Sequence, residues 1–405
     1  MDSRVDNMII LLVFLLCFLL LISHAELGES TWELSRKEEF QFEHQLINLQ
    51  KSAIKSIQTD GDIYDCIDFY KQPGFNHPFW KNTTFQMKRK LFMEAMKTNV
   101  NLPVSTIGLK DGGCPYGTVP IMRIDEDGLT RAKMNSKILY LTEPGYHYAI
   151  LQTKPDLTRK IEGIQAAFSC FNAKGVDESQ YSSFRMTLSN NLDSIKTGLT
   201  VNPLLFKDNK TRLFTQVVMD GRRQCFNYLC PGYIQLNPQI PLGWPVDTIS
   251  VIGGEQYVMK LQVLKEYINR GANTTELVWT LRVEAVENSI LGFWPTKVFS
   301  KLSEFGNYAD WGGEVYSPLD QPSPAMGTGI RPLGHKWSTA YSAHSRFVAL
   351  AYHEADLQSK FESPNDTEVY ESDSKSYSIL DIGHKSKMPG DYLIIYDGPG
   401  GIQSN

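Results

Sequence analysis

The sequence predicts an all-β protein, preceded by a leader and by a segment of mixed helix and strand. From about residue 138 onward, apolar and polar residues alternate with a period of two. Turns that contain Gly and Pro separate these short segments, and no long helical pattern interrupts them. Many short antiparallel strands of this kind are typical of a sandwich or a barrel.

Residues 1–25 have the pattern of a secretory signal. Arg4 provides a weak positive charge, residues 8–22 form an apolar run too short to span a bilayer comfortably, and cleavage is expected after Ala25. The charged, amphipathic segment that follows argues against a membrane anchor. We therefore expect a secreted protein with no membrane attachment once the signal is removed.

The segment before residue 138 mixes several kinds of structure. Apolar residues near three–four spacing predict an amphipathic helix over residues 32–57. Gly and Pro then predict irregular, turn-rich structure over residues 60–78. Residues 114–121 have the pattern of a short edge strand with a proline near its start.

The clearest strand prediction is a hairpin. In residues 256–264 and 276–284 apolar residues alternate with polar ones, and a polar connection joins the two segments. Residues 296–304 are compatible with a short helix. Further strands are expected over residues 138–141, 146–152, 212–219, 347–352 and 392–396.

Charge and cysteine content narrow the choice of partners and cofactors. The net charge is −5, and no basic run is long enough to indicate nucleic-acid binding. Cys17 belongs to the leader, and the odd number of cysteines that remain leaves at least one thiol unpaired within the chain. Cys225 and Cys230 favour a small-loop disulfide over half of a zinc site, because no second Cys or His pair accompanies them.

Four Asn-x-Thr sequons on a chain with a signal fit a glycoprotein that is exposed at those loops. They are at Asn82, Asn209, Asn273 and Asn365.

Several enzyme classes are disfavoured. The sequence contains no G-x-S-x-G, Walker A or H-E-x-x-H pattern, and its histidines are scattered without metal-ligand spacing. No metal or other cofactor is therefore expected. One acid stands out, Glu314 in the stretch DWGGEV of residues 310–315. The two glycines allow another backbone to come close, and a neighbouring Trp can raise the pKa of an acid by excluding water. A strand start with an exposed Glu is the simpler alternative.

Distinctive motifs occur in order along the chain. In the first part they are DGDIYDCID at 60–68, YKQP at 70–73 with HP at 77–78, and CPYGTVP at 114–120. In the second part they are DNKTRLF at 208–214, LCPGYIQ at 229–235, GFWP at 292–295, WGGEV at 311–315 and GPGG at 398–401. From about residue 30 to the C-terminus, the chain resembles the plant neprosin family.

The resemblance implies an activation-peptide domain over residues 26–137 and a neprosin domain over residues 138–405, built as two stacked antiparallel sheets. It also implies a proline-directed endopeptidase of the glutamic type, made as a zymogen and active in acid. In such a peptidase one ionised Glu takes a proton from water, while a second, protonated Glu polarises the scissile carbonyl or donates to the leaving amine.

The family's second glutamate matches Glu314, and its first falls within residues 195–203, where Lys196 stands in its place and Leu199 replaces a tryptophan. An ammonium about 4 Å from a carboxylate contributes roughly 4 kcal/mol at an effective dielectric near 20. We therefore expect Glu314 to stay ionised in acid, paired with Lys196. The cleft of the family is expected to include Leu199, Trp311, Gly312 and Gly313.

Other acids are poor substitutes for the missing glutamate. Asp193 lies three residues from Lys196 and is expected on the opposite face of a strand, and Glu255 is a remote alternative. Two further departures concern cysteines. Serines stand near residues 376–378, where the family begins a C-terminal disulfide, and Cys170 has no place in the family pattern and is the candidate for the unpaired thiol.

Three functional interpretations follow. The leading one is a secreted, monomeric protein of the apoplast or cell wall, with impaired or no peptidase activity, that binds proline-containing peptides or wall proteins. The second is an active acid peptidase that recruits another carboxylate. The third is a structural wall glycoprotein without a ligand.

Overall fold

The computed structural model describes residues 42–59, 61–82, 107–110, 112–136, 144–219, 221, 223–229, 232–271, 274–284, 289–332, 338–353, 360–384 and 390–402. They belong to two compact units, Met1–Asn48 and Leu49–Asn405. In the first unit, residues 42–48 are helical. The signal predicted over residues 1–25 lies outside the described residues. Among those described, no helix is long and apolar enough to cross a membrane.

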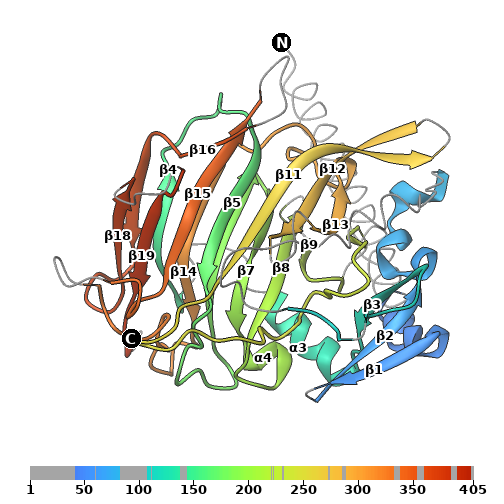
Figure 1. Cartoon of the computed structure of the whole chain (residues 1–405), viewed down its shortest axis with the longest axis horizontal. Coiled ribbons are helices and arrows are strands. Elements are labelled where there is room, and N and C mark those ends of the chain that lie inside the picture. Colours follow the sequence, from blue (N-terminus) through green and yellow to red (C-terminus); the bar gives the residue numbers. More distant parts are fainter. Residues whose placement is uncertain are drawn as a thin grey trace, which may run out of the picture. The chain divides into compact units, whose positions relative to one another are not determined.

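Two large antiparallel sheets lie face to face in the second unit (Figure 1). Within the described residues, the seven-stranded sheet has the order β17 (Thr367–Glu371), β4 (Tyr146–Thr153), β14 (Tyr308–Tyr316), β6 (Tyr181–Asn190), β7 (Asp193–Val201), β8 (Thr211–Met219) and β9 (Arg223–Phe226). The nine-stranded sheet has the order β10 (Ile234–Gln235), β13 (Ser289–Pro295), β12 (Thr274–Val283), β11 (Val258–Gly271), β5 (Ile161–Ser169), β15 (His344–Tyr352), β19 (Leu393–Asp397) and β18 (Ser378–Gly383), with β16 (Phe361–Glu362) paired to β15. The all-β prediction is confirmed, and the architecture is a sandwich.

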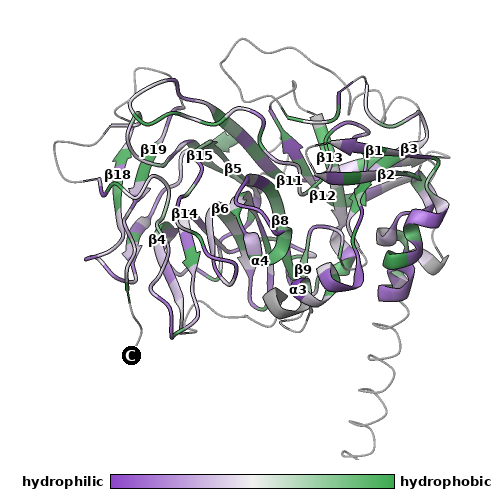
Figure 2. Cartoon of the chain, turned by 90° about the horizontal axis from the view of Figure 1, so that it is seen from below, coloured by the Kyte–Doolittle hydropathy of each residue, from purple (hydrophilic) through white to green (hydrophobic). Residues whose placement is uncertain are grey.

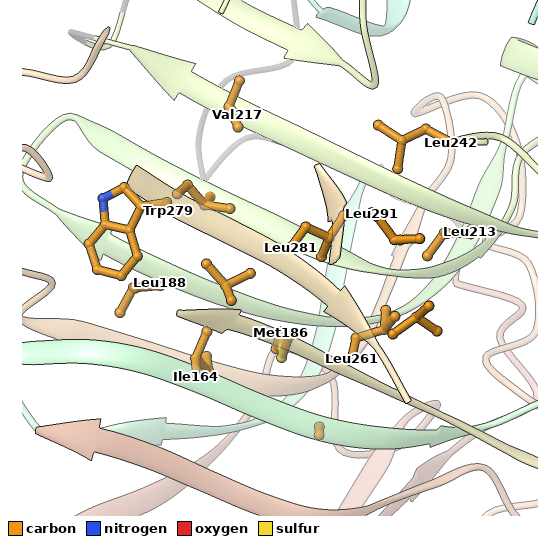
Figure 3. Close-up of a cluster of buried hydrophobic side chains, with 14 of the residues drawn as sticks. Ile164, Met186, Leu188, Leu213, Val217, Leu242, Leu261, Trp279, Leu281 and Leu291 are labelled. Carbon is orange, nitrogen blue, oxygen red and sulfur yellow. The ribbon is translucent and has the colours of Figure 1, made fainter. Parts of the chain in front are cut away.

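The main hydrophobic core lies between the two sheets, because each strand turns alternate side chains toward it. Trp311 of β14 is fully buried there, and its indole N–H donates to the carbonyl of Gln165 in β5 at 3.1 Å. Figure 3 shows part of this core, including Met186 and Trp279. Burial of each large apolar side chain contributes roughly 1.5–3 kcal/mol.

The predicted hairpin is confirmed as β11 and β12, and it is longer than expected. Its ladder runs from Leu261 opposite Val283 to Gly271 opposite Thr274. The strands therefore continue through the segment expected to be a polar connection. In this extension Tyr267 pairs with Leu277 and Ile268 with Glu276. Next to it, Arg282 donates to both carboxylate oxygens of Glu266 at 2.7 and 2.9 Å.

Most of the other strand predictions for the second half of the chain are confirmed. The strands expected over 146–152, 212–219, 347–352 and 392–396 are β4, β8, β15 and β19. The one expected over 138–141 lies outside the described residues. The helical segment at 296–304 is reduced to the 3-10 turn η5 (Thr296–Val298). Strands β5 and β6 were not predicted, because both are buried along most of their length and show little alternation.

The N-terminal part of the second unit differs more from expectation. The helix predicted over 32–57 is wrong at its end, where the 3-10 turn η1 (Leu49–Ser52) leads into a strand, and residues 32–41 lie outside the described part. The segment 60–78 contains a strand followed by turns, and the edge strand near 114–121 is confirmed. The elements are β1 (Lys55–Thr59), β2 (Asp62–Asp68), η2 (Phe69–Lys71), η3 (Pro73–Asn76), η4 (Pro78–Asn82), β3 (Thr118–Met122) and α3 (Glu126–Ser136).

A three-stranded sheet of order β1-β2-β3 accounts for these differences. Gly61, at φ +93°, adopts the left-handed conformation that a tight β1–β2 hairpin requires. Strand β2 then pairs with β3, which lies about fifty residues further along the chain. Local sequence patterns carry no information on such distant pairing, so the segment looks irregular when it is read alone.

The described cysteines adopt two states. Cys66 and Cys114 form a disulfide, and Cys170 is free and buried, as expected for the unpaired thiol. Cys225 is disulfide-bonded, while its expected partner Cys230 lies outside the described residues. Of the four sequons, Asn209 and Asn365 are exposed, Asn82 ends η4, and Asn273 lies outside the described residues.

Polar contacts hold the region where the family's C-terminal disulfide was expected. The hydroxyl of Ser378 accepts hydrogen bonds from Nε and Nη2 of Arg331 at 3.1 and 2.9 Å. The same guanidinium donates to the carbonyl of Lys375 at 2.9 Å. Side-chain hydrogen bonds of this kind contribute about 1 kcal/mol each, so they offset part of the 2–4 kcal/mol that a disulfide typically adds.

Candidate active site

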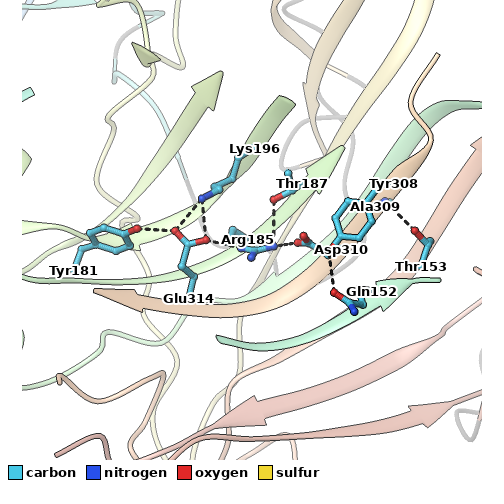
Figure 4. Close-up of polar contacts among 10 residues, drawn as sticks. All are labelled: Gln152, Thr153, Tyr181, Arg185, Thr187, Lys196, Tyr308, Ala309, Asp310 and Glu314. Atoms are coloured by element: carbon cyan, nitrogen blue, oxygen red, sulfur yellow. Dashed lines mark hydrogen bonds and ion pairs between the residues drawn. The ribbon is translucent and has the colours of Figure 1, made fainter. Parts of the chain in front are cut away.

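Glu314 lies in the middle of β14, on the face of the seven-stranded sheet that points away from the main core. Its side chain is only 2% exposed. Lys196 of β7 reaches the same point, and its Nζ lies 2.9 Å from Oε1 and 2.8 Å from Oε2 of Glu314 (Figure 4). The Lys196 side chain is 17% exposed, so the pair is almost enclosed.

Arg185 of β6 lies between the two strands and contacts two carboxylates. Its Nε donates to Oε2 of Glu314 at 2.9 Å, and its other end forms an ion pair with Asp310. The phenol of Tyr181 donates to Oε1 of Glu314 at 2.6 Å. Each oxygen of Glu314 thus accepts two hydrogen bonds (Figure 4). Oε1 accepts from Lys196 and Tyr181, and Oε2 accepts from Lys196 and Arg185.

Sequence reasoning missed Arg185, Tyr181 and Asp310 as members of this cluster. Spacing offers one signal, since residues 181 and 185 on β6, and residues 310 and 314 on β14, are four apart and therefore share a face. Which strands become neighbours is not visible in that spacing. Strand β14 pairs with β6 across a long interval of sequence, whereas β6 and β7 are joined by a tight turn.

The cluster keeps Glu314 ionised. Burial alone would raise the pKa of Glu314, but the charges of Lys196 and Arg185 and the hydrogen bonds from Lys196 and Tyr181 outweigh it and lower the pKa to about 2. Burial also lowers the pKa of Lys196, which its partner Glu314 opposes only in part. Glu314 is therefore unsuited to be a proton donor in mild acid.

This environment leads to a prediction about acid stability. The ordinary pKa of a glutamate near 4.5 falls to about 2 in the folded protein, so the ionised group stabilises the fold fully above about pH 4.5. That stabilisation, about 3 kcal/mol by linkage, is lost as the pH falls toward 2. In urea unfolding at a series of pH values, the stability difference between wild type and Glu314→Gln should shrink over this range. A difference that does not change with pH would contradict the assignment.

The residues expected to line a cleft lie mostly elsewhere. Leu199 and Trp311 are fully buried in the core between the sheets, on the other face from Glu314. A Cβ at Gly313 would lie 2.1 Å from the sulfur of Met326, so this residue also faces inward. The period of two along each strand places these residues opposite Lys196 and Glu314. Trp311 therefore does not raise the pKa of Glu314, contrary to the interpretation from the sequence.

Gly312 is the remaining member of the expected cleft, and it pairs with Arg185 across β14 and β6. Its φ of +144° and its close approach to β4 require glycine, because a Cβ would lie 2.2 Å from the carbonyl oxygen of Ala149. Gly312 therefore allows β14 to pair closely with β4 beside the charged cluster.

Two family models match the chain. The model described as Neprosin matches residues 178–399, and that described as Neprosin activation peptide matches residues 53–154. The chain belongs to the neprosin family. The junction expected near residue 138 stays a prediction, although the activation-peptide match extends into β4.

Two solved structures of scytalido-glutamic peptidase are similar to this neprosin-family protein. One contains a peptide-based transition-state analogue; it is 10% identical, covers 63% of this chain and 98% of its own, and has a TM-score of 0.29. The other contains a transition-state analogue inhibitor; it is 9% identical, with the same coverage and a TM-score of 0.30.

The other carboxylates considered from the sequence have different partners. Asp193 is fully buried on the far side of β7, as expected, and its Oδ2 accepts from the Ser300 hydroxyl at 2.9 Å and from the backbone N–H groups of Lys301 and Leu302 at 2.5 and 3.1 Å. Glu255 is exposed and accepts from the phenol of Tyr257 at 2.7 Å. Asp193 is therefore a structural anchor in this neprosin domain.

We predict that Asp193→Ala lowers the free energy of unfolding by about 2–4 kcal/mol, because three donors lose a charged acceptor inside the protein. Asp193→Asn keeps an acceptor oxygen of the same shape and should lose less than half as much. Urea unfolding monitored by tryptophan fluorescence measures both. Equal losses for the two variants would show that packing, and not the acceptor, matters at this position.

Within the described residues, no group of three or more His, Cys, Asp and Glu side chains is arranged to hold a metal ion. The polar cluster around Glu314 contains two cations and two carboxylates, and they pair with each other. Its chemistry is therefore that of a neutral ion-pair network.

Proposed function

We propose that this neprosin-family protein is secreted, that its peptidase activity is impaired or absent, and that it binds proline-containing peptides at the face that carries Glu314. The observation that carries the proposal is the contact of Lys196 with both carboxylate oxygens of Glu314, at 2.9 and 2.8 Å. A bound ammonium occupies the position from which a second carboxyl group would act.

Peptide hydrolysis by two acids needs one group that accepts a proton from water and one that donates a proton. Both oxygens of Glu314 are engaged by donors, and its low pKa disfavours protonation. The other carboxylate of the cluster, Asp310, pairs with the far end of Arg185. Among the described residues, no second carboxyl group bonds to Glu314 or Lys196, which weighs against an active peptidase that recruits another acid.

Aromatic side chains beside Glu314 favour peptide binding. Tyr146, Tyr148, Tyr181 and Tyr316 contact one another, with ring centroids 5.0 to 6.2 Å apart. Tyr148 and Tyr316 stand opposite or beside Glu314 in the ladders, so these rings share its face of the sheet. Tyr148 and Tyr181 are buried, whereas Tyr146 and Tyr316 are partly exposed. Exposed aromatic rings recognise extended proline-rich segments, which lose little conformational entropy on binding.

Calorimetric titration with a proline-rich peptide tests the binding. We expect saturable heat with that peptide and none with a matched peptide in which alanine replaces proline. Tyr316→Ala, which removes a partly exposed ring, should weaken binding by about tenfold, or roughly 1.4 kcal/mol. No heat with either peptide would favour the structural-glycoprotein interpretation. Acid-dependent cleavage that Glu314→Gln abolishes would overturn the proposed loss of activity.

A further inference from the structure

The outer face of the nine-stranded sheet carries a row of polar side chains that the candidate active site does not use. Figure 2 shows β5, β11 and β15 in the layer opposite β14 and β6, so this face and the one that carries Glu314 lie on opposite sides of the sandwich. Met259 and Leu261 of β11 are fully buried in the core between the sheets. Lys260 and Gln262 alternate with them and therefore point outward.

Hydrogen bonds join this row across four strands. Nζ of Lys260 and Nε2 of Gln262 both donate to Oε1 of Glu284, which directly follows β12, at 2.8 and 3.1 Å. Nε2 of Gln262 also donates to Oε1 of Gln165 in β5 at 2.9 Å. Nε2 of Gln165 donates in turn to the carbonyl of Phe347 in β15 at 3.1 Å. The contacts follow the order β12, β11, β5 and β15, in which the strands lie in the sheet.

Phe347 lies at an irregularity in β15. The register of β15 against β5 shifts between Arg346 and Ala349. Between them, Phe347 has a φ of +53°, in the left-handed region that a bulky side chain rarely adopts. An irregularity of this kind redirects a side chain, and residues in such strained conformations cluster at functional sites. The placement of the Phe347 ring therefore points to a role for it on this face.

The ring of Phe347 lies between two cations. Nζ of Lys260 in β11 is 5.5 Å from the ring centroid, and the guanidinium carbon of Arg346 in β15 is 5.7 Å from it. Both cations belong to residues that pair with Ala167 of β5, which is only 1% exposed. The ring therefore lies over β5, where the small side chain of Ala167 leaves room for it. Phe347 is partly exposed, so part of the ring is open to a ligand.

The ions around the ring are paired with one another. Lys260 contacts Glu284 at 2.8 Å, and Nε of Arg346 donates to both carboxylate oxygens of the buried Asp391 at 3.2 Å. The two pairs carry no net charge, so a charged ligand gains little from them. The side chains of Lys260, Glu284 and Arg346 are nevertheless 21%, 33% and 31% exposed. They offer hydrogen-bond donors and acceptors to solvent beside an aromatic ring.

A neutral sugar chain has the matching chemistry. Each hydroxyl group can donate to a carboxylate and accept from an ammonium or a guanidinium, and the C–H face of a pyranose ring packs on an aromatic ring. Neighbouring strands lie about 4.8 Å apart, which is close to the length that one sugar ring adds to an extended β-1,4-linked chain. A chain laid across the strands would therefore bring successive rings over Glu284, Lys260 and Phe347.

We propose that the outer face of the nine-stranded sheet, around Phe347, Lys260, Glu284 and Arg346, binds a neutral, extended β-1,4-linked oligosaccharide. One sugar ring stacks on Phe347, and the three charged side chains bind hydroxyl groups of this ring and its neighbours. The site lies on the other side of the sandwich from Glu314, so the proposal depends neither on peptide binding nor on peptidase activity.

Calorimetric titration of the purified full-length protein with cellohexaose tests the proposal. We expect saturable binding that added salt leaves nearly unchanged, because the ligand is uncharged. Maltohexaose is the matched control, since it has the same sugar and length but an α-linked chain that coils. It should bind about tenfold more weakly or not at all. No saturable binding of cellohexaose, or equal affinity for the two oligosaccharides, would overturn the proposal.

Variants of the aromatic residues identify the surface. Phe347→Ala should raise the dissociation constant for cellohexaose about tenfold, whereas Phe347→Tyr keeps the ring and should bind like the wild type. Tyr267→Ala removes a 71% exposed ring from β11 outside the site and should also bind like the wild type. If Phe347→Ala fails to fold, Lys260→Met replaces it and should weaken binding. Unchanged affinity in the site variant, or an equal loss in Tyr267→Ala, would overturn the assigned surface.

Discussion

Lys196→Glu is expected to give the protein acid-dependent peptidase activity on proline-containing peptides, with kcat/KM about 10²–10⁴-fold above wild type. The change removes the ammonium from Glu314 and places a second carboxyl group beside it. Arg185 still contacts Glu314 at 2.9 Å and favours its ionised form, so the introduced carboxyl group is the one that holds the proton. The glutamate side chain ends one atom short of the lysine ammonium, so its carboxyl group lies farther from Glu314 than the ammonium does.

Two controls separate this mechanism from a general effect of losing the lysine. Lys196→Gln removes the charge without supplying an acid, and it should remain inactive. The double variant Lys196→Glu/Glu314→Gln should be inactive as well. Cleavage rates on a chromogenic proline peptide from pH 3 to pH 7 measure all four proteins. Activity in Lys196→Glu that persists in the double variant, or wild-type activity at the same level, would contradict the expected roles.

Arg185→Met is expected to lower the free energy of unfolding by about 3–5 kcal/mol, which is the typical cost of breaking a buried ion pair. Arg185 is fully buried and is the cation shared by Asp310 and Glu314. Without it, Asp310 loses its ion-pair partner inside the protein. The pKa of Glu314 should also rise, because one of its two nearby positive charges is removed.

The matched control is Lys154→Met, which removes a cation from an exposed pair with Asp366. Exposed pairs contribute about 0–1 kcal/mol, so this variant should unfold at nearly the wild-type urea concentration. Arg185→Lys keeps the charge but loses the guanidinium that contacts Asp310 and Glu314 with its two ends. Its free energy of unfolding should therefore lie between those of Arg185→Met and Lys154→Met. Similar stabilities for Arg185→Met and Lys154→Met would show that the cluster is not held by charge.

The charge balance of the cluster offers a reason why lysine is accepted at position 196. Lys196 and Arg185 together match Glu314 and Asp310 in charge. With a carboxylate in place of the lysine, one cation would face three acids, and at neutral pH this buried cluster would be strained by like charges. Active sites commonly carry such strain at the expense of stability. The lysine is therefore expected to stabilise the fold while it removes the acid needed for catalysis.

Local patterns in the sequence predicted several parts of the structure correctly. Alternation predicted the β11–β12 hairpin, because a strand with one buried face repeats every two residues. The motif around residues 195–203 placed Lys196 at the position of an acid, and the structure brings its ammonium to Glu314. The period of two along β7 also predicted that Asp193 lies on the opposite face of the strand from Lys196, and Asp193 is buried there.

Other features depended on which strands become neighbours. Arg185, Tyr181 and Asp310 join Glu314 only because β6 lies between β14 and β7. Leu199 and Trp311 looked like cleft residues beside the functional motifs, yet they pack into the core. Strands β1 and β2 likewise formed where the sequence indicated a helix and turns.

The sequence by itself determined the family, the all-β class and the replacement of an acid by Lys196, since each is carried by residue identity or by a local period. The tertiary structure alone decided how Glu314 is charged and how the activation segment is held. Both are set by groups far apart in the chain, such as Arg185 with Glu314 and Gln72 with Gln235. Electrostatic and packing energies depend on distance in space, which a local pattern does not contain.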